Sequence, residues 1–354
     1  MGEQHEPGAY LKATLAGQPR ELERILADGE PAAQAAKRVA GCLRVFLVGT
    51  GTSYHGALAG QHMLRSAGVD AWAVRAFEFA IYPPPIRDDD GLILLSHRGT
   101  KRYSQQALDL FAKTSDRWIA ITGIGSPLEG PGVVRTVEQE RSPVHTASHT
   151  GALLRLAQVA MSLGDPGWGA ELAEIPSSVG WAIDEYREMI AADVRDIRLE
   201  PVVHYVGGGP GRATAYEGAL KIREASHVVS AEGHDLEGLL HGPLVSIQPG
   251  QVVVLIAQRG PAEERTRDVA RALSEIGATL ILAGSATDEL AGVDGVKAAQ
   301  GYQTPPHHEV LAPIVNVVPL QLLAYEASRH VGVDADSFRR DEKEYAAAQS
   351  KFTL

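Results

Sequence analysis

The sequence has 354 residues, of which 44% are hydrophobic and 22% are charged, and its formal net charge is −11. This composition is typical of a folded globular protein and excludes an intrinsically disordered chain. No stretch approaches the roughly 20 apolar residues that span a bilayer, and the first residues lack the basic and then apolar pattern of a signal peptide. We therefore expect a cytoplasmic protein that does not bind membranes.

Charge and cysteine content narrow the choice of ligand. An acidic chain with a pI near 5.6 and no long run of Lys or Arg lacks the basic surface by which proteins bind nucleic acid. The single cysteine, Cys42, excludes intrachain disulfides and clusters of thiolate ligands. These features favour a small molecule as the partner. Because the chain is acidic overall, an anionic ligand would have to be held by a local binding site.

Short apolar runs alternate along the chain with longer amphipathic stretches, which is the pattern of parallel strands joined by helical crossovers. This pattern predicts an α/β fold. The predicted strands are Val45–Val48, Leu92–Leu95, Trp118–Ile121, Val202–Val206, Val252–Ile256 and Thr279–Leu282.

These strands form two sets of three with similar endings. VFLVGTG matches VHYVGGG, ILLSHRG matches VLIAQRG, and IAITG matches LILAG. The matching Gly49 and Gly207 lie 158 residues apart, and the other two pairs of glycines lie 161 residues apart. A near-constant offset indicates an internal repeat. We predict a lead-in segment (1–30), a first domain (31–165), a helical linker (166–198), a second domain (199–333) and a tail (334–354).

Three turns in the first half carry small, hydroxyl or basic residues where a strand meets a helix. In a parallel sheet, ligands bind at the carboxyl ends of the strands, and anions bind at helix N-termini. Each turn alone is typical of ordinary helix capping, but three in one half favour an anion site. The candidate residues are Thr50, Gly51, Thr52 and Ser53; Ser96, His97, Arg98, Gly99, Thr100 and Lys101; and Thr146 and Ser148. The dinucleotide and P-loop fingerprints are both incomplete, so we expect no cofactor.

The second half offers a different set of groups. Glu217, Lys221 and Glu224 have the spacing that places three side chains on one face of a helix, and His241 follows in a Gly-Pro turn. Spacing alone is equally typical of a solvated face with salt bridges. Carboxylate, amine and imidazole are nonetheless the groups that open a sugar ring and move a proton between neighbouring carbons.

Other histidines give no metal-binding pattern. His145 with His149, and His307 with His308 and Glu309, match no metal-ligand spacing. We interpret them as surface or turn histidines and expect no metal.

Several long stretches resemble one known family. Ala215–Ser226 (AYEGALKIREAS), Glu237–Leu244 (EGLLHGPL) and Pro306–Pro313 (PHHEVLAP) are similar to the second sugar isomerase (SIS) domain of glucosamine-6-phosphate synthases. Gly51–His55 (GTSYH) resembles a turn in the first SIS domain of the same family. The resemblance begins near Tyr10 and covers the rest of the chain. It implies two tandem SIS domains, each a parallel sheet flanked by helices in a flavodoxin-like three-layer α/β/α arrangement.

The resemblance also implies roles for single residues. Glu224 matches the catalytic base that moves a proton between C1 and C2 through an enediol or enolamine, and Lys221 matches a lysine beside the reacting carbonyl. His241 matches a histidine that assists ring opening in the neighbouring subunit, which implies a homodimer with shared active sites. Thr52, Ser53 and Ser148 match hydroxyl donors to sugar and phosphate.

Three departures qualify the resemblance. The usual phosphate loop of the family reads SQSGET, whereas Ser96–Lys101 reads SHRGTK, which exchanges hydroxyl groups for cations. The end of the chain keeps only the start of the family's C-terminal motif, and Lys351 is the nearest match to its catalytic lysine. Position 2 is Gly where the glutaminase part of the synthase has its nucleophilic cysteine, so we expect no glutamine hydrolysis.

The resemblance therefore implies an enzyme that acts on a hexose or hexosamine phosphate, either as an aldose-ketose isomerase or as an amino-sugar-phosphate deaminase. Two alternatives stay open. One is a sugar-phosphate sensor without catalysis, and the other is a deglycase of sugar-amino acid phosphates.

Overall fold

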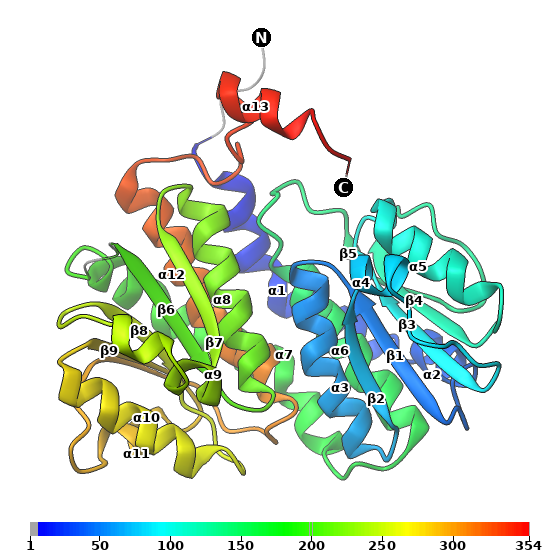
Figure 1. Cartoon of the computed structure of the whole chain (residues 1–354), viewed down its shortest axis with the longest axis horizontal. Helices are drawn as coiled ribbons and strands as arrows, with labels where there is room; N and C mark the ends of the chain where they lie inside the picture. Colours follow the sequence, from blue (N-terminus) through cyan, green and yellow to red (C-terminus); the bar gives the residue numbers. More distant parts are fainter. Residues whose placement is uncertain (1–5, 198, 200, 354) are drawn as a thin grey trace. The chain divides into compact units, whose positions relative to one another are not determined.

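The computed structural model describes residues 6–197, 199 and 201–353 (Figure 1). The chain divides into two compact units, each built around one sheet. The first-sheet unit holds residues 17–140, 145–176 and 339–353, and the second-sheet unit holds the described residues of 1–16, 141–144 and 177–338. Helices α1 (Ala9–Ala27) and α7 (Gly169–Asp193) contribute residues to both units, so the predicted lead-in and linker are each divided between them.

The first-sheet unit contains a parallel sheet of five strands in the order β2-β1-β3-β4-β5. Its strands are β1 (Arg44–Gly49), β2 (Ala71–Arg75), β3 (Asp90–Leu95), β4 (Trp118–Ile124) and β5 (Val133–Glu138). Its helices are α2 (Glu30–Ala36), α3 (Thr52–Ser66), α4 (Ala76–Ile81), α5 (Arg102–Ala112), α6 (Ala147–Leu163) and α13 (Lys343–Gln349).

The second-sheet unit contains a parallel sheet of five strands in the order β7-β6-β8-β9-β10, which repeats the order of the first. Its strands are β6 (Val202–Gly207), β7 (Ser230–Asp235), β8 (Val252–Ile256), β9 (Thr279–Gly284) and β10 (Ala298–Gln303). Its helices are α8 (Gly211–Ser226), α9 (Leu236–Leu240), α10 (Glu263–Ile276), α11 (Thr287–Ala291), α12 (Ala312–Val331) and the short 3₁₀ helix η1 (Pro243–Ser246).

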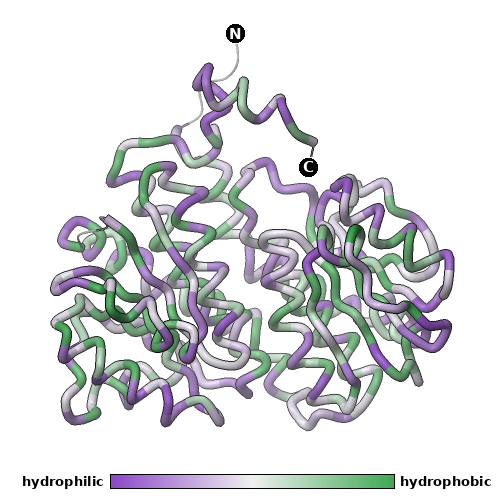
Figure 2. Tube along the Cα trace, viewed as in Figure 1, coloured by the Kyte–Doolittle hydropathy of each residue, from purple (hydrophilic) through white to green (hydrophobic). Residues whose placement is uncertain are grey.

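All six predicted strands are present, as β1, β3, β4, β6, β8 and β9. Strands β3 and β8 are buried along their whole length, which explains their uninterrupted apolar sequence. Figure 2 shows hydrophobic residues concentrated along the strands of both units. The helical region before β1 consists of two helices, because the chain breaks between α1 and α2 at Asp28 and Gly29.

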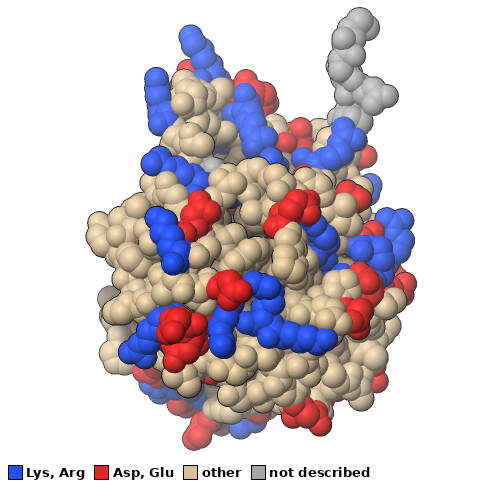
Figure 3. Space-filling model, turned by 90° about the vertical axis from the view of Figure 1, so that its right-hand side faces the viewer, with Lys and Arg blue, Asp and Glu red and all other residues tan. Residues whose placement is uncertain are grey.

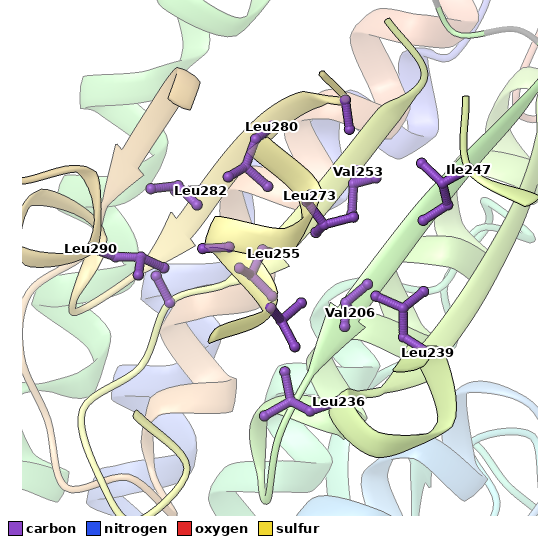
Figure 4. Packing of buried hydrophobic residues seen from close by; sticks show 14 residues of the cluster. Val206, Leu236, Leu239, Ile247, Val253, Leu255, Leu273, Leu280, Leu282 and Leu290 are labelled. Atoms are coloured by element: carbon purple, nitrogen blue, oxygen red, sulfur yellow. The ribbon is translucent and has the colours of Figure 1, made fainter. Parts of the chain in front are cut away.

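Each sheet has helices on both faces. In the second-sheet unit, Val206, Val253 and Leu280 point from three strands toward Leu239 of α9 and Leu273 of α10 (Figure 4). Helices α8 and α12 pack together on the opposite face. In the first-sheet unit, β1, β3 and β4 pack against α4 and α5, while α3 packs against α6. Within the described residues, no helix is long and apolar enough to span a bilayer.

Equivalent glycines allow the helices to approach the sheets closely. A Cβ atom on Gly60 of α3 would lie 2.7 Å from Leu156 of α6 and 2.9 Å from Leu47 of β1. A Cβ atom on Gly218 of α8 would lie 2.7 Å from Leu320 of α12 and 2.8 Å from the ring of Tyr205 in β6. Gly60 and Gly218 lie 158 residues apart, the same offset as Gly49 and Gly207. The two units therefore share this packing detail as well as strand order.

Candidate active site

A buried row of charged side chains runs along α8 in the second-sheet unit. Lys221 has no exposed side-chain surface, and its Nζ lies 3.4 Å from Oε1 of Glu217 and 2.5 Å from Oε2 of Glu224. Glu217 is also fully buried, whereas the Glu224 side chain keeps 20% of its surface exposed. The predicted shared face is therefore confirmed, and the solvated-face alternative is wrong for Glu217 and Lys221.

The sequence of α8 explains this arrangement. Alanine and glycine occupy most of the other inward positions of the helix, so α8 packs closely on β6 and α12 around the longer charged side chains. Buried charges are tolerated when they are paired, and here one ammonium joins two carboxylates. Since Glu224 alone keeps an exposed edge, it is the carboxylate in this row that a ligand from solvent reaches.

His241 lies outside this row. Its Nδ1 is 2.9 Å from the backbone oxygen of Glu237 and 3.5 Å from the Glu237 carboxylate, and 76% of its side chain is exposed. Lys351 follows α13 in the first-sheet unit and is exposed. Glu237 is itself paired with Arg265, whose hydrogen bond is the main cause that lowers the pKa of the Glu237 carboxyl.

The first-sheet unit has a small cavity at the carboxyl ends of its strands. Thr52, Ser53, Ser96, His97 and Ser148 line it, so five of the candidate residues from three separate turns meet here. The other residues of the lining include His145, His149 and Thr136. The cavity measures about 30 Å³, which is enough to hold a water molecule. It therefore has room for a small polar group.

The turn before α3 depends on glycine. A Cβ on Gly49 would lie 2.5 Å from the backbone of Ser53, and Gly51 has a positive φ of 55°. The chain therefore turns tightly enough to start α3 at Thr52 and to direct the hydroxyls of Thr52 and Ser53 to the cavity. Thr50 and Gly51 form this turn without lining the cavity.

A side chain that the sequence analysis missed occupies the N-terminus of α6. The Glu140 carboxylate accepts hydrogen bonds from the backbone N–H groups of Thr146 (3.0 Å) and Ser148 (2.6 Å). These N–H groups were expected to face a bound anion, and an internal carboxylate holds them instead because negative charge is stabilised at a helix N-terminus. The Oγ1 of Thr146 is buried without a hydrogen-bond partner.

The Ser96–Lys101 loop has the expected mixture of hydroxyl and cationic groups. The Ser96 Oγ is buried without a hydrogen-bond partner, and Gly99 has a positive φ of 68°. Arg98 and Thr100 are exposed, and neither they nor Lys101 line the cavity. Burial lowers the pKa of Lys101, and the positive charges of Arg98 and Arg340 lower it further. Arg340, which no motif singled out, therefore adds a third cation to this loop.

Three histidines line the same cavity, namely His97, His145 and His149. Their spacing in the sequence did not predict that they lie together. The rings of His97 and His145 are 5.2 Å apart, and His149 is 3% exposed. Burial is the main cause that lowers the pKa of His97 to about 4, with a smaller contribution from Arg98, so its imidazole is neutral near pH 7. The interpretation as surface or turn histidines is wrong for His149, which is buried in α6. His307 lies in the connection between β10 and α12, but it is 8% exposed and 2.9 Å from Ser178 Oγ, so it is not a surface residue.

The expectation that nucleic acid is not the partner concerns the surface charge, and it stays a prediction. On the face shown in Figure 3, Lys and Arg side chains are interspersed with Asp and Glu side chains.

Part of the chain matches a known domain family, and nearly all of it is similar to known proteins. Residues 200–330 match the family model of the SIS domain. A glutamine–fructose-6-phosphate aminotransferase (isomerizing) of Methanothermobacter thermautotrophicus is 28% identical over 94% of this chain and 57% of the relative. The chain spans about half the length of the curated relatives it matches.

Solved structures share the fold. The C-terminal domain of glucosamine-fructose-6-phosphate aminotransferase from Francisella tularensis has a TM-score of 0.79 at 20% identity, over 92% of this chain and 97% of that domain. The glucosamine-6-phosphate deaminase of Thermotoga maritima has a TM-score of 0.72 at 22% identity, over 93% and 97%. Residues 200–330 thus match the SIS domain model, and nearly the whole chain is similar to about half the length of glutamine–fructose-6-phosphate aminotransferases.

Proposed function

We propose that this protein is a sugar-phosphate isomerase or an amino-sugar-phosphate deaminase, with Glu224 as the base that moves a proton between C1 and C2. The observation that carries the proposal is the row on α8, in which Lys221 is buried between Glu217 and Glu224 and only Glu224 keeps an exposed edge. Burying an ammonium and its two carboxylates costs desolvation free energy. Charged groups buried at this cost are typical of functional sites, which supports a catalytic role for the row.

The proton transfer follows from the groups of α8. The Glu224 carboxylate removes the proton from C2 of the open-chain aldose, which gives an enediol or, with an amine on C2, an enolamine. The same carboxyl returns the proton to C1. With a hydroxyl on C2 the product is a ketose, and with an amine on C2 the resulting imine adds water and releases ammonia. Lys221, at 2.5 Å from Glu224, orients that carboxylate.

The cavity of the first-sheet unit supplies the groups for a phosphate or sugar hydroxyl in this proposal. Its lining includes the hydroxyls of Thr52, Ser53 and Ser148, and Ser96 brings a buried oxygen that has no hydrogen-bond partner. The cations Arg98, Lys101 and Arg340 add positive charge to the adjacent loop. Hydroxyl and cationic donors are the groups that bind phosphate oxygens.

The same proposal includes the architecture and assembly. The common strand order and the equivalent Gly60 and Gly218 support two tandem SIS domains in a three-layer arrangement, with limits near 31–165 and 199–333. The 76% exposure of the His241 side chain supports its action in the active site of a second subunit, and hence a homodimer.

The first test is proton NMR of the purified protein in deuterated water. Glucosamine-6-phosphate, glucose-6-phosphate, and fructose-6-phosphate with ammonium or with glutamine are the substrates. Solvent deuterium at C1 or C2 together with ammonia release supports a deaminase, and deuterium with aldose-ketose exchange alone supports an isomerase. Binding of these sugar phosphates without exchange contradicts the proposal and favours a sensor. Turnover only of a fructosamine-type amino acid phosphate favours a deglycase.

A further inference from the structure

We propose that His97, Glu140 and His145 form a binding site for one divalent transition-metal ion of the Zn²⁺ type. One ligand atom from each of these residues lies within 4.8 Å of the other two. The Nδ1 of His145 is 3.9 Å from Oε1 of Glu140, and the two imidazole rings meet edge to face. Neighbouring ligand atoms in a tetrahedral zinc site are about 3.4 Å apart, given zinc bonds of about 2.0–2.1 Å. Small rotations of the two imidazoles close the remaining gap.

The carboxylate is already held in place for this role. The Glu140 side chain is 3% exposed, and each of its oxygens accepts one backbone N–H at the start of α6. A carboxylate oxygen offers about two lone-pair sites, so an oxygen that accepts a hydrogen bond can also bind a metal. Hydrogen bonds that fix ligand orientation are a regular feature of metal sites. Glu140 thus stays in position with or without the ion.

The His97 ring is also held close to the position that this role needs. The backbone N–H of Glu140 donates to Nε2 of His97 at 3.2 Å, which directs that nitrogen's lone pair toward Glu140. This distance is at the long end for such a hydrogen bond, so a metal bond is a stronger partner for the same lone pair. On the other side of the ring, Gly123 packs so closely that a Cβ there would lie 2.6 Å from Nδ1. Nε2 is therefore the nitrogen that coordinates the ion.

The cavity next to these ligands has the size for the ion's remaining partner. His97 and His145 both line it, and its volume of about 30 Å³ is enough to hold a water molecule. Two imidazoles and one carboxylate form a ligand set known for zinc, and three protein ligands leave a position for water or for an oxygen of a bound ligand. The positive charge of Arg98 opposes a cation, but the Arg98 side chain is exposed and therefore screened by solvent.

A second group in the second-sheet unit, His204, Glu232 and His234, has similar composition. Its ligand atoms also lie close together, with 3.2 Å between Nδ1 of His204 and Nε2 of His234 and 3.5 Å between that Nε2 and Oε2 of Glu232. Its carboxylate is 61% exposed, whereas that of Glu140 is buried and held by the start of α6. A variant of His234 therefore tests which of the two groups binds the ion.

The test is isothermal titration calorimetry with Zn²⁺ on the tag-free protein after chelator treatment and dialysis. We expect one equivalent to bind, and the His145→Ala variant to bind about 100-fold more weakly or not at all, because it removes a direct ligand. The His234→Ala variant should bind like the wild type. Co²⁺ in place of Zn²⁺ should give a visible absorption spectrum that His145→Ala loses.

Unchanged zinc affinity in folded His145→Ala, or no binding by the wild type, would overturn the proposal. Circular dichroism and thermal unfolding establish that each variant is folded. If His145→Ala does not fold, His97→Gln provides the same comparison with a side chain of similar size. Because the readout is metal binding without any sugar phosphate, its failure leaves the proposed isomerase activity standing, and failure of that activity leaves this site standing.

Discussion

The Nζ atom of Lys221 lies 2.5 Å from Oε2 of Glu224, three residues further along the same helix. The Lys221 side chain is fully buried and that of Glu224 is one-fifth exposed, so the ion pair joins the interior of the second-sheet unit to its surface. Glu217 closes the row on the inner side at 3.4 Å. This row makes α8 both a structural element and a source of reactive groups.

Loss of the buried ammonium should destabilise the fold. The Lys221→Met variant leaves Glu217 buried without its cation, and we expect the free energy of unfolding to fall by about 3–5 kcal/mol. Urea denaturation measures this change. The partly exposed pair Glu263 and Arg267 on α10 has a similar i, i+4 spacing, so Arg267→Met should cost no more than about 0.5 kcal/mol. Equal losses in the two variants would contradict a special role for burial.

The turn after β6 should not tolerate a side chain. A Cβ on Gly207 would lie 2.3 Å from the carbonyl oxygen of Gly211, so Gly207→Ala forces backbone movement. We expect the free energy of unfolding to fall by about 1–3 kcal/mol, as for other overpacked sites. Gly17 in α1 has open space around its Cβ position, so Gly17→Ala is the control and should be neutral or stabilising. Thermal unfolding of both variants distinguishes these outcomes.

Stability should fall as the pH drops below the ordinary pKa of histidine. Burial lowers the pKa of His204 and of His234, the charge of His234 lowers that of His204 further, and Glu232 and Asp235 oppose the shift only in part. The unfolded chain therefore binds protons at a higher pH than the folded protein does. The stability contributed by these neutral imidazoles is complete above about pH 6.5 and is lost as the pH falls below it.

Urea denaturation between about pH 7.5 and about pH 5 measures this dependence, because this range includes the ordinary pKa of histidine. We expect His234→Gln to reduce the slope of unfolding free energy against pH. His241→Gln, at a largely exposed position, is the control for loss of an imidazole. A slope that His234→Gln does not alter would exclude this pair as its source.

The segment after α12 should stabilise the start of α1. The Asp336 carboxylate accepts the backbone N–H groups of Tyr10 and Leu11, and Asp334 accepts that of Gly8. Loss of one capping carboxylate typically costs about 1 kcal/mol. We expect Asp336→Ala to lower the unfolding free energy by that amount and to speed hydrogen exchange in the first turn of α1. Asp341→Ala, at an exposed position, is the control.

The sequence predicted the inner strands and missed the outer ones for a physical reason. Strands β1, β3, β4, β6, β8 and β9 lie inside their sheets or are covered on both faces, so their sequences are nearly continuous apolar runs. The four edge strands β2, β5, β7 and β10 contain exposed or polar residues, and β7 reads SAEGHD. Such segments become strands through pairing with a neighbour rather than through their own composition.

The sequence likewise predicted one part of the candidate site and missed another. The row on α8 was predictable because helical spacing of three and four residues places side chains on one face. The group of His97, Glu140 and His145 was not, because 43 residues separate His97 from Glu140 and only the β3 and β5 strand ends bring them together. The spacing of residues along the sequence does not reveal contacts between residues so far apart.

The most direct measurement of the central claim compares Glu224→Gln with wild type by deuterium exchange at C1 and C2 of glucosamine-6-phosphate and fructose-6-phosphate. Glu263→Gln, on the exposed face of α10, is the control for loss of a carboxylate. We expect exchange to fall at least about 100-fold in Glu224→Gln, the scale of general-base catalysis, while sugar-phosphate binding by calorimetry stays within a few fold. Exchange at the wild-type rate in folded Glu224→Gln would contradict the assignment of Glu224 as the base.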